Sequence, residues 1–152
     1  MEAFDSMRRT GVVIAMTTTL LAAHGGGITA SGIAKAASGT AANTVTVQMI
    51  GSSSGYKFDP ASLTVKAGDQ VKFVNVSGGP HNVSFDPQGI PSGAAAVLQK
   101  NMPNQQAPLI GPLLINANDA YTVSFAGAPT GTYHFYCLPH QALNMTGTIT
   151  VQ

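Results

Sequence analysis

Short runs of alternating apolar and polar residues, each bounded by glycine, proline or aspartate, are the feature that most restricts how this chain can fold. In residues 44–50, Val45, Val47 and Met49 alternate with polar neighbours, which is the period of a strand with one buried face. Six more β-like runs follow, at residues 63–66, 70–76, 81–85, 121–125, 132–137 and 146–151. Strands so short and so numerous predict an all-β sandwich or a small barrel of about seven to eight strands.

The connections between these runs carry two further predictions. The triplet Ala67-Gly68-Asp69 is typical of a turn, and it joins two β-branched runs in the manner of a hairpin. Residues 87–114 contain five prolines and have no strand period, so they predict a long irregular connection. Within that connection only residues 94–100 favour a turn or two of helix.

The first 36 residues predict a cleaved export signal. Arg8 and Arg9 precede an apolar run at residues 11–23, and the small-x-small site Ala34-Lys35-Ala36 follows, so we expect cleavage after Ala36. The apolar run is shorter than the roughly 20 residues that span a bilayer, so we expect no stable membrane insertion after cleavage. The mature chain would then have a flexible tail at 37–43 and one domain at 44–152, in the periplasm, the thylakoid lumen or on the extracellular side of the membrane.

The charge of the chain argues against nucleic acid as a partner and against strong electrostatic steering. The whole chain has a formal net charge of +1 and no clustered basic surface, which excludes an electrostatic case for nucleic acid. From residue 37 onward four lysines balance four aspartates, so long-range steering by net charge is expected to be weak.

The chain has a single cysteine, Cys137, although exported proteins commonly form disulfides. Three explanations are open for such a thiol: it is buried and inert, it pairs with another chain, or it binds a metal. The surrounding residues 131–145 favour the metal. Alternation directs Cys137 inward at the end of a strand, and the turn at Leu138-Pro139 lets His140 and Met145 fold back toward the sulfur.

One more histidine, His81, begins another run directly after Pro80. Two imidazoles, one thiolate and one weak axial thioether form the trigonal site of blue copper proteins, which transfer single electrons. A zinc ion on the same residues is disfavoured, because methionine is a poor zinc ligand. His134 points outward by alternation and is expected at the surface, and Met102 is expected to fill space in the long connection.

Four segments in order resemble the cupredoxin family and, within it, the plastocyanins. The resemblance covers nearly all of the expected mature chain. Its carriers are Pro-His-Asn-Val at 80–83 with Phe-Asp at 85–86, Ile-Pro-Ser-Gly at 90–93, Gly-Thr-Tyr-His-Phe-Tyr-Cys at 131–137, and Cys-x₂-His-x₄-Met followed by Gly-Thr-Ile-Thr-Val at 147–151.

The resemblance implies a Greek-key β-sandwich that holds one copper ion at its upper end. The implied ligands are His81, Cys137, His140 and Met145. His140 would be the partly exposed edge through which electrons pass, within an apolar docking patch. The resemblance also implies that Tyr136 is a second contact point and possible electron relay.

Asn82 is implied to lie outside the ligand set, where it ties the two ligand loops together.

Three positions depart from the family pattern. Residues 141–144 lack the usual glycines, Leu138 replaces a small polar residue, and Tyr56 falls where an apolar patch residue is expected. The acidic runs that plant members use to meet their partners are absent as well. These departures are expected to affect the partner more than the metal.

Enzymatic functions are disfavoured. Copper oxidases and nitrite reductases need additional copper centres, but only three histidines remain after residue 36, and a binuclear copper domain needs a second cysteine. No activated serine, paired carboxylates or phosphate-binding glycine loop stands out. A copper chaperone or storage protein with the same ligands stays as the alternative to an electron carrier.

The expected partners of the carrier are redox proteins. A membrane cytochrome complex would stand on one side, and a photosystem, a terminal oxidase or a copper reductase on the other. A carrier that docks briefly is expected to be a monomer.

Overall fold

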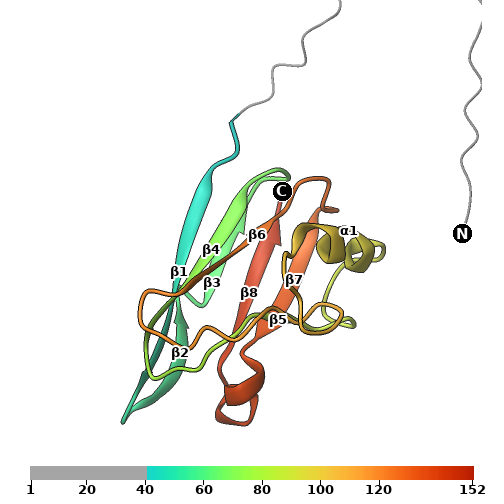
Figure 1. Ribbon diagram of the computed structural model, residues 1–152. Helices are drawn as coiled ribbons and strands as arrows, with labels where there is room; N and C mark the ends of the chain where they lie inside the picture. Colours follow the sequence, from blue (N-terminus) through green and yellow to red (C-terminus); the bar gives the residue numbers. More distant parts are fainter. Residues whose placement is uncertain (1–40) are drawn as a thin grey trace, which may run out of the picture. The chain divides into compact units, whose positions relative to one another are not determined.

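The computed structural model describes residues 41–152, which form two four-stranded sheets (Figure 1). The strand orders are β2-β1-β4-β6 and β3-β8-β7-β5. The strands are β1 (Thr44–Ser52), β2 (Gly55–Asp59), β3 (Ser62–Val65), β4 (Gln70–Ser77), β5 (Ser84–Phe85), β6 (Ala120–Ser124), β7 (Gly131–Tyr136) and β8 (Thr146–Val151). The predicted all-β sandwich is therefore confirmed.

The expected export signal at residues 1–36, its cleavage after Ala36 and most of the tail at 37–43 lie outside the described residues. The last residues of that tail, 41–43, are described and exposed. No helix in the described part of the chain is both long enough and apolar enough to cross a bilayer.

A cluster of phenylalanine rings joins the two sheets. The centroid of Phe135 on β7 lies 4.7 Å from that of Phe58 on β2, 5.4 Å from that of Phe73 on β4 and 6.2 Å from that of Phe85 on β5. The pairs of Phe135 with Phe58 and Phe73 are edge-to-face, and such pairs contribute about 0.5–1.5 kcal/mol each beyond the burial of their area. A glycine at position 147 makes the arrangement possible, because a Cβ atom there would collide with the Phe135 ring.

The predicted hairpin around residues 67–69 is wrong. β3 pairs in parallel with β8 in one sheet, whereas β4 pairs with β1 and β6 in the other. The triplet is a turn, with Gly68 at φ 108°, but it carries the chain from one sheet to the other. Alternation reports which face of a strand is buried and says nothing of which strand lies beside it, so the error follows from the limit of the pattern.

Two other strand predictions need correction. β2 was not predicted, although Tyr56 and Phe58 alternate with polar residues, because a run of serines and glycines precedes it and Pro60 follows it. The predicted strand at 81–85 is reduced to the two residues of β5. At its start, His81 forms only an isolated bridge with Leu114.

The long connection at residues 87–114 packs against the sandwich. Its helix α1 (Ala94–Asn101) confirms the short helix predicted around 94–100, and it buries Ala94 and Leu98. Met102 is 2% exposed and belongs to the core, as expected of a residue that fills space. The hydroxyl group of Tyr121 on β6 donates a hydrogen bond of 2.9 Å to the carbonyl of Pro103. This bond ties the long connection to β6.

The turn between the sheets generates a pH-dependent prediction. The Asp69 carboxylate accepts hydrogen bonds from the backbone N–H groups of Asn43 (3.0 Å) and Lys66 (2.9 Å). These bonds lower the pKa of Asp69 below its usual value, Lys66 having the larger effect. A lowered pKa stabilises the folded state at neutral pH, and that stabilisation is lost as the pH falls through the folded-state pKa.

We therefore expect Asp69→Asn to lower the free energy of unfolding at pH 7, measured by urea denaturation. The difference from the unsubstituted protein should shrink below about pH 4, where the carboxylate becomes protonated. Asp86→Asn is the control, because Asp86 accepts its side-chain hydrogen bond from the exposed Gln88 N–H only. A difference for Asp69→Asn that stays constant from pH 7 to pH 3 would contradict the prediction.

Candidate metal centre

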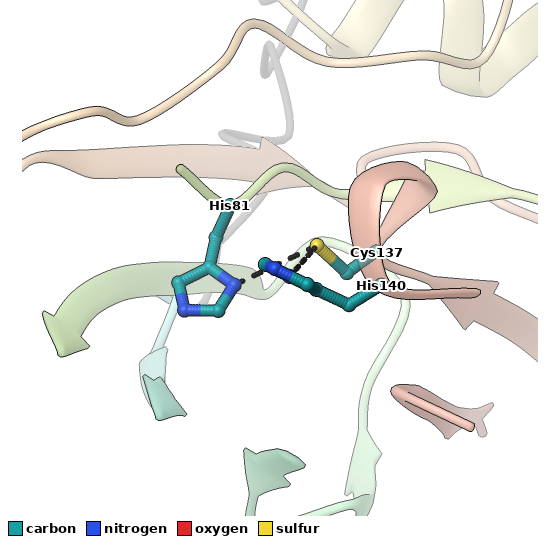
Figure 2. A group of neighbouring side chains, drawn as sticks. All are labelled: His81, Cys137 and His140. Atoms are coloured by element: carbon teal, nitrogen blue, oxygen red, sulfur yellow. Dashed lines mark hydrogen bonds between the residues drawn. The ribbon is translucent and has the colours of Figure 1, made fainter. Parts of the chain in front are cut away.

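Two parts of the chain that are far apart in the sequence place donor atoms at one end of the sandwich. His81 lies in the β4–β5 connection, Cys137 directly follows β7, and His140 lies in the short 3₁₀ segment η1 (Leu138–Leu143). Met145 follows η1 and precedes β8. One nitrogen each from His81 and His140 and the sulfur of Cys137 all lie within 4.8 Å of one another. Figure 2 shows both imidazole rings directed at the sulfur.

His81 is held at its backbone and at its ring. Its N–H donates to the carbonyl of Leu114 (3.0 Å), and its own carbonyl accepts from the Leu114 N–H (2.7 Å). Ring atom Nε2 lies 2.9 Å from the carbonyl oxygen of Ser77, so Nε2 carries the proton and donates it. Nδ1 is then the unprotonated nitrogen, and it lies 3.6 Å from Cys137 Sγ. The hydrogen bond to Ser77 thus selects the tautomer that offers a lone pair to a metal.

The thiol of Cys137 is fully buried, and its sulfur lies between the two imidazoles. Sγ is 3.4 Å from Nδ1 of His140 and 3.5 Å from the backbone nitrogen of Asn82, whose N–H points to the sulfur. An N–H directed at sulfur stabilises a thiolate and tunes any metal bound to it.

Asn82 links the segments that carry the two histidines. Its side-chain oxygen accepts a 2.8 Å hydrogen bond from the N–H of Leu138, and its amide nitrogen lies 3.4 Å from the carbonyl of Gly111. The residue is 1% exposed, so water does not compete for these bonds. One side chain therefore ties the His81 segment to the start of η1 and to the long connection.

Backbone hydrogen bonds close the loop that runs from Cys137 to Met145. The N–H of Cys137 donates to the carbonyl of Met145 (3.0 Å), and the N–H of Met145 donates to the carbonyl of His140 (3.2 Å). Asn144, at φ 60°, reverses the chain between them. The Met145 side chain is fully buried at this end of the core. The loop is thus short and fixed at both ends.

Burial sets the protonation of the metal-free donors. Burial lowers the pKa of His81, partly offset by the hydrogen bond to Ser77. Burial, and after it the charge of His81, lowers the pKa of His140. Burial raises the pKa of the Cys137 thiol, although the backbone amides of Asn82 and His140 act in the opposite direction. Both histidines are therefore favoured in the neutral form that binds metals, and a metal must displace the proton of Cys137.

The spacing of these atoms fits a metal ion. Two donors that bind one metal at about 2.0–2.3 Å, with about 120° between the bonds, are about 3.5–4 Å apart. The two sulfur–nitrogen distances of 3.6 Å and 3.4 Å agree with that geometry. Thiolate with imidazoles and a thioether is a donor set suited to copper, because the soft sulfur ligands favour Cu(I) and imidazole accepts both oxidation states.

Exposed apolar side chains lie on the segments that carry or support the two histidines. His140 is 9% exposed, and five large apolar residues of the described chain are exposed by between 39% and 68%. We call them the apolar rim, and they are Val76, Leu113, Ile115, Leu138 and Leu143. Leu138 and Leu143 begin and end η1, and the other three flank Ser77 or Leu114, the residues bonded to His81.

Sequence reasoning placed Tyr56 near this patch and missed its contact. The Tyr56 ring stacks on the His140 imidazole, with centroids 3.8 Å apart and planes at 14°. β2, the strand that carries Tyr56, is not among the predicted strands, so the sequence alone does not show on which side of the sheet Tyr56 lies. The alternation of Tyr56 with Phe58 was the signal that could have found it.

Two other residues singled out from the sequence lie on the outer face of β7. His134 is exposed, and Nδ1 of His134 lies 3.5 Å from the hydroxyl of Thr148, away from the metal centre. Tyr136 is half-buried and lines a groove with His134, Asp86 and Gln141. Tyr136 directly precedes Cys137, so it is one peptide unit from the residue that carries the buried sulfur, while its own side chain faces outward.

Comparison with known proteins points to one family. Residues 45–152 match the family described as copper binding proteins, plastocyanin/azurin family. The plastocyanin of Scenedesmus fuscus is 41% identical over 108 residues, which cover 71% of this chain and 99% of that relative. The plastocyanin of Nostoc punctiforme is 45% identical over 96 residues, covering 62% of this chain and 64% of the relative, or just under two thirds of its length. The chloroplastic plastocyanin of Pisum sativum is 40% identical over 123 residues, covering 78% and 67%.

Solved structures agree with the sequence matches. Oxidised plastocyanin from Dryopteris crassirhizoma has a TM-score of 0.56 and 35% identity, covering 71% of this chain and all of that structure. Pseudoazurin from Methylobacterium extorquens has a TM-score of 0.50 and 27% identity, covering 72% and 75%. These similarities confirm the predicted cupredoxin-like Greek-key sandwich.

The position of Asn82 predicts a loss of stability on its removal. Asn82→Ala would remove the acceptor of the partly buried N–H of Leu138, a hydrogen bond of a kind that contributes about 0.5–1.5 kcal/mol. We expect a decrease of that size in the free energy of unfolding of the metal-free protein, measured by urea denaturation. Asn101→Ala is the matched control, because the amide of Asn101 also donates to a backbone carbonyl, of Ala126, but it does so at the surface. Equal losses in the two variants would contradict the role assigned to Asn82.

Proposed function

This chain belongs to the plastocyanin/azurin family of copper-binding proteins and is a type 1 copper electron carrier, and we propose that its one copper ion is held by His81, Cys137, His140 and Met145. The observation that carries this ligand assignment is the convergence of two imidazole nitrogens, of His81 in the β4–β5 connection and of His140 in η1, on the buried sulfur of Cys137. When bound, copper supplies a centre that gains or loses one electron.

The protein contributes a site that resists rearrangement. The Ser77 carbonyl and the bridge to Leu114 hold His81, and the Asn82 side chain holds the segment that starts with Leu138. A site whose ligands are fixed by the fold changes its charge with little movement, which favours rapid electron transfer. The buried position of Cys137 also protects the sulfur from oxidation and from pairing with other thiols.

A copper chaperone or storage protein with the same ligands is the second function to weigh. Such proteins release their metal and therefore favour exposed ligands. Here His81, Cys137 and Met145 are fully buried, and His140 is only 9% exposed. We therefore favour a carrier that keeps its metal over a protein that delivers it, and a carrier over an enzyme.

Electrons are proposed to enter and leave through two regions of the surface. The first is the edge of His140, because this imidazole is a proposed copper ligand and also reaches the surface. The second is Tyr136, which adjoins Cys137 along the backbone and faces the groove beside His134. The proposed partners are a membrane cytochrome complex on one side and a photosystem, terminal oxidase or copper reductase on the other. The proposed compartment is the periplasm, the thylakoid lumen or the extracellular side of a membrane.

The ligand assignment is tested by two substitutions. Cys137→Ser should abolish the intense blue absorption that appears when Cu(II) is added, because a hydroxyl group does not replace the thiolate. Met145→Gln should retain copper and lower the reduction potential, because an amide oxygen is a harder ligand than a thioether and favours Cu(II). Visible and electron-spin spectra with redox titration measure both effects.

His134→Gln is the control for these variants, since His134 is exposed and lies outside the donor group. It should leave colour and potential unchanged. Unchanged absorption in Cys137→Ser would refute the assignment. A colourless unsubstituted protein, or one that loses its copper at once to a mild chelator, would instead favour the chaperone or storage function.

The charge distribution bears on how partners dock. The described residues carry four lysines and four aspartates, and none of the eight belongs to the apolar rim. Asp119 lies near it, but its carboxylate accepts the N–H groups of Ile115 and Asn116 at 3.0 Å and 2.8 Å. Docking at the rim is therefore proposed to rest on apolar contact, with little electrostatic steering.

We expect the oxidation rate of the reduced protein to depend weakly on salt. Between 10 and 200 mM salt, the rates with anionic ferricyanide and with a cationic cobalt phenanthroline complex should each change by about twofold or less. Leu143→Glu is the positive control, because it places a charge on the rim. It should make the two rates change with salt in opposite directions. A strong dependence of opposite sign in the unsubstituted protein would contradict apolar docking.

A further inference from the structure

The two histidines of the metal centre are held in different ways. The ring of His81 is fixed by a hydrogen bond from Nε2 to the carbonyl of Ser77. Within residues 41–152, Nε2 of His140 has no such hydrogen-bond partner, and the only polar contact of its ring is the one between Nδ1 and Cys137 Sγ. Metal-binding histidines almost always have an outer partner that sets the orientation of the ring. Something other than a hydrogen bond must therefore orient His140.

The Tyr56 ring is placed to do this. It lies nearly parallel to the His140 imidazole, at 14°, with the centroids 3.8 Å apart. Its relation to His81 is different, with centroids 6.1 Å apart and planes at 70°. Rotation of the His140 ring out of its present plane would break the stack, whereas the edge contact with His81 at 4.9 Å constrains it less.

Strand β1 is shaped to support the tyrosine from behind. Tyr56 is opposite Gly51 in the β1–β2 ladder. A Cβ atom at position 51 would lie 2.6 Å from Cε1 and 2.7 Å from Cδ1 of the Tyr56 ring. Only glycine therefore leaves room for the ring between the β1 backbone and the imidazole. The β1–β2 hairpin thus serves as a rigid support for one face of His140.

We propose that Tyr56 is the positioning residue for His140, holding the imidazole in its ligating orientation by stacking, as the Ser77 carbonyl holds His81. The inference rests on the proposed ligand set. Its consequence is kinetic: the ring opposes rotation of His140 away from the metal, so it slows the loss of copper through the one ligand that reaches the surface.

The experiment compares Tyr56→Phe, which keeps the ring, with Tyr56→Leu and Tyr56→Met, which remove it. The two ring-free variants guard against a failure of either one to fold. Lys57→Gln is the matched control, because Lys57 is the next residue on β2 and its ammonium group pairs with Asp59 at the surface. Two measurements are made on each protein, one without metal and one with copper.

The first measurement is the NMR spectrum of the metal-free protein. In the unsubstituted protein and in Tyr56→Phe, the carbon-bound ring protons of His140 should be shifted upfield by the stacked ring. In Tyr56→Leu and Tyr56→Met they should return toward the positions of a free imidazole. The Nε2–H signal of His81 is the internal reference and should persist in all variants, because its bond to Ser77 does not involve Tyr56.

The second measurement is the rate of Cu(I) transfer from the reduced protein to bicinchoninate at constant pH. An aromatic pair of this kind corresponds to roughly a 2-fold to 12-fold change in a rate or equilibrium. Tyr56→Leu and Tyr56→Met should release copper faster by that factor, while Tyr56→Phe and Lys57→Gln should match the unsubstituted protein.

Three outcomes would overturn the proposal: His140 proton shifts that do not depend on the ring, equal release rates in all variants, or release from Tyr56→Phe as fast as from Tyr56→Leu. The last would assign the effect to the hydroxyl group. The NMR measurement needs no copper, so it tests the stack even if the ligand assignment fails. A failed ligand assignment is recognised separately, by the blue absorption surviving in Cys137→Ser.

Discussion

Three polar donor atoms are buried close together at the end of an apolar sandwich. The rest of the site depends on the contacts that compensate these atoms for the loss of water. Polar groups removed from water must find partners inside the protein. The structure provides them one at a time: a carbonyl for the His81 ring, a backbone N–H for the Cys137 sulfur and a tyrosine face for His140. The two Nδ1 atoms and the sulfur keep lone pairs that are not used in these contacts, and they face one another. Lone pairs that converge in this way are what a metal ion needs.

The aromatic cluster between the sheets gives this arrangement its rigidity. Phe135 lies on β7, two residues before Cys137, and it packs on rings from both sheets. Closely packed interiors resist deformation, so the sulfur at the end of β7 has a fixed position relative to β4 and its outgoing loop. A carrier benefits from such a frame, because electron transfer is fast when the ligands move little between the two oxidation states.

The surface complements the buried site. His140 is 9% exposed, and exposed apolar side chains lie on the segments that carry or support the two histidines. A surface of this kind binds briefly and releases readily, which suits a protein that must leave one partner to reach the next. Tyr56 belongs to both the site and the surface, since it stacks on His140 and is itself half-buried.

The sequence by itself determined the class of fold and the chemistry of the centre. Period-two alternation identified most strands, and Cys137, His140 and Met145 are close enough along the chain for one turn to bring them together. Only the tertiary structure decided which strands are neighbours. In the structure, β3 and β4 lie in different sheets and β2 forms an additional strand. The sequence could not predict this, because alternation reports burial and carries no information on pairing.

The same limit applies to contacts within the site. Cys137 and Asn82 are 55 residues apart, and Tyr56 is farther still from His140, so these contacts depend on how the sheets and loops assemble. Local patterns name the donor atoms, because ligand chemistry belongs to residue types. The partners that orient those atoms are supplied by distant segments, and only the folded chain brings them together.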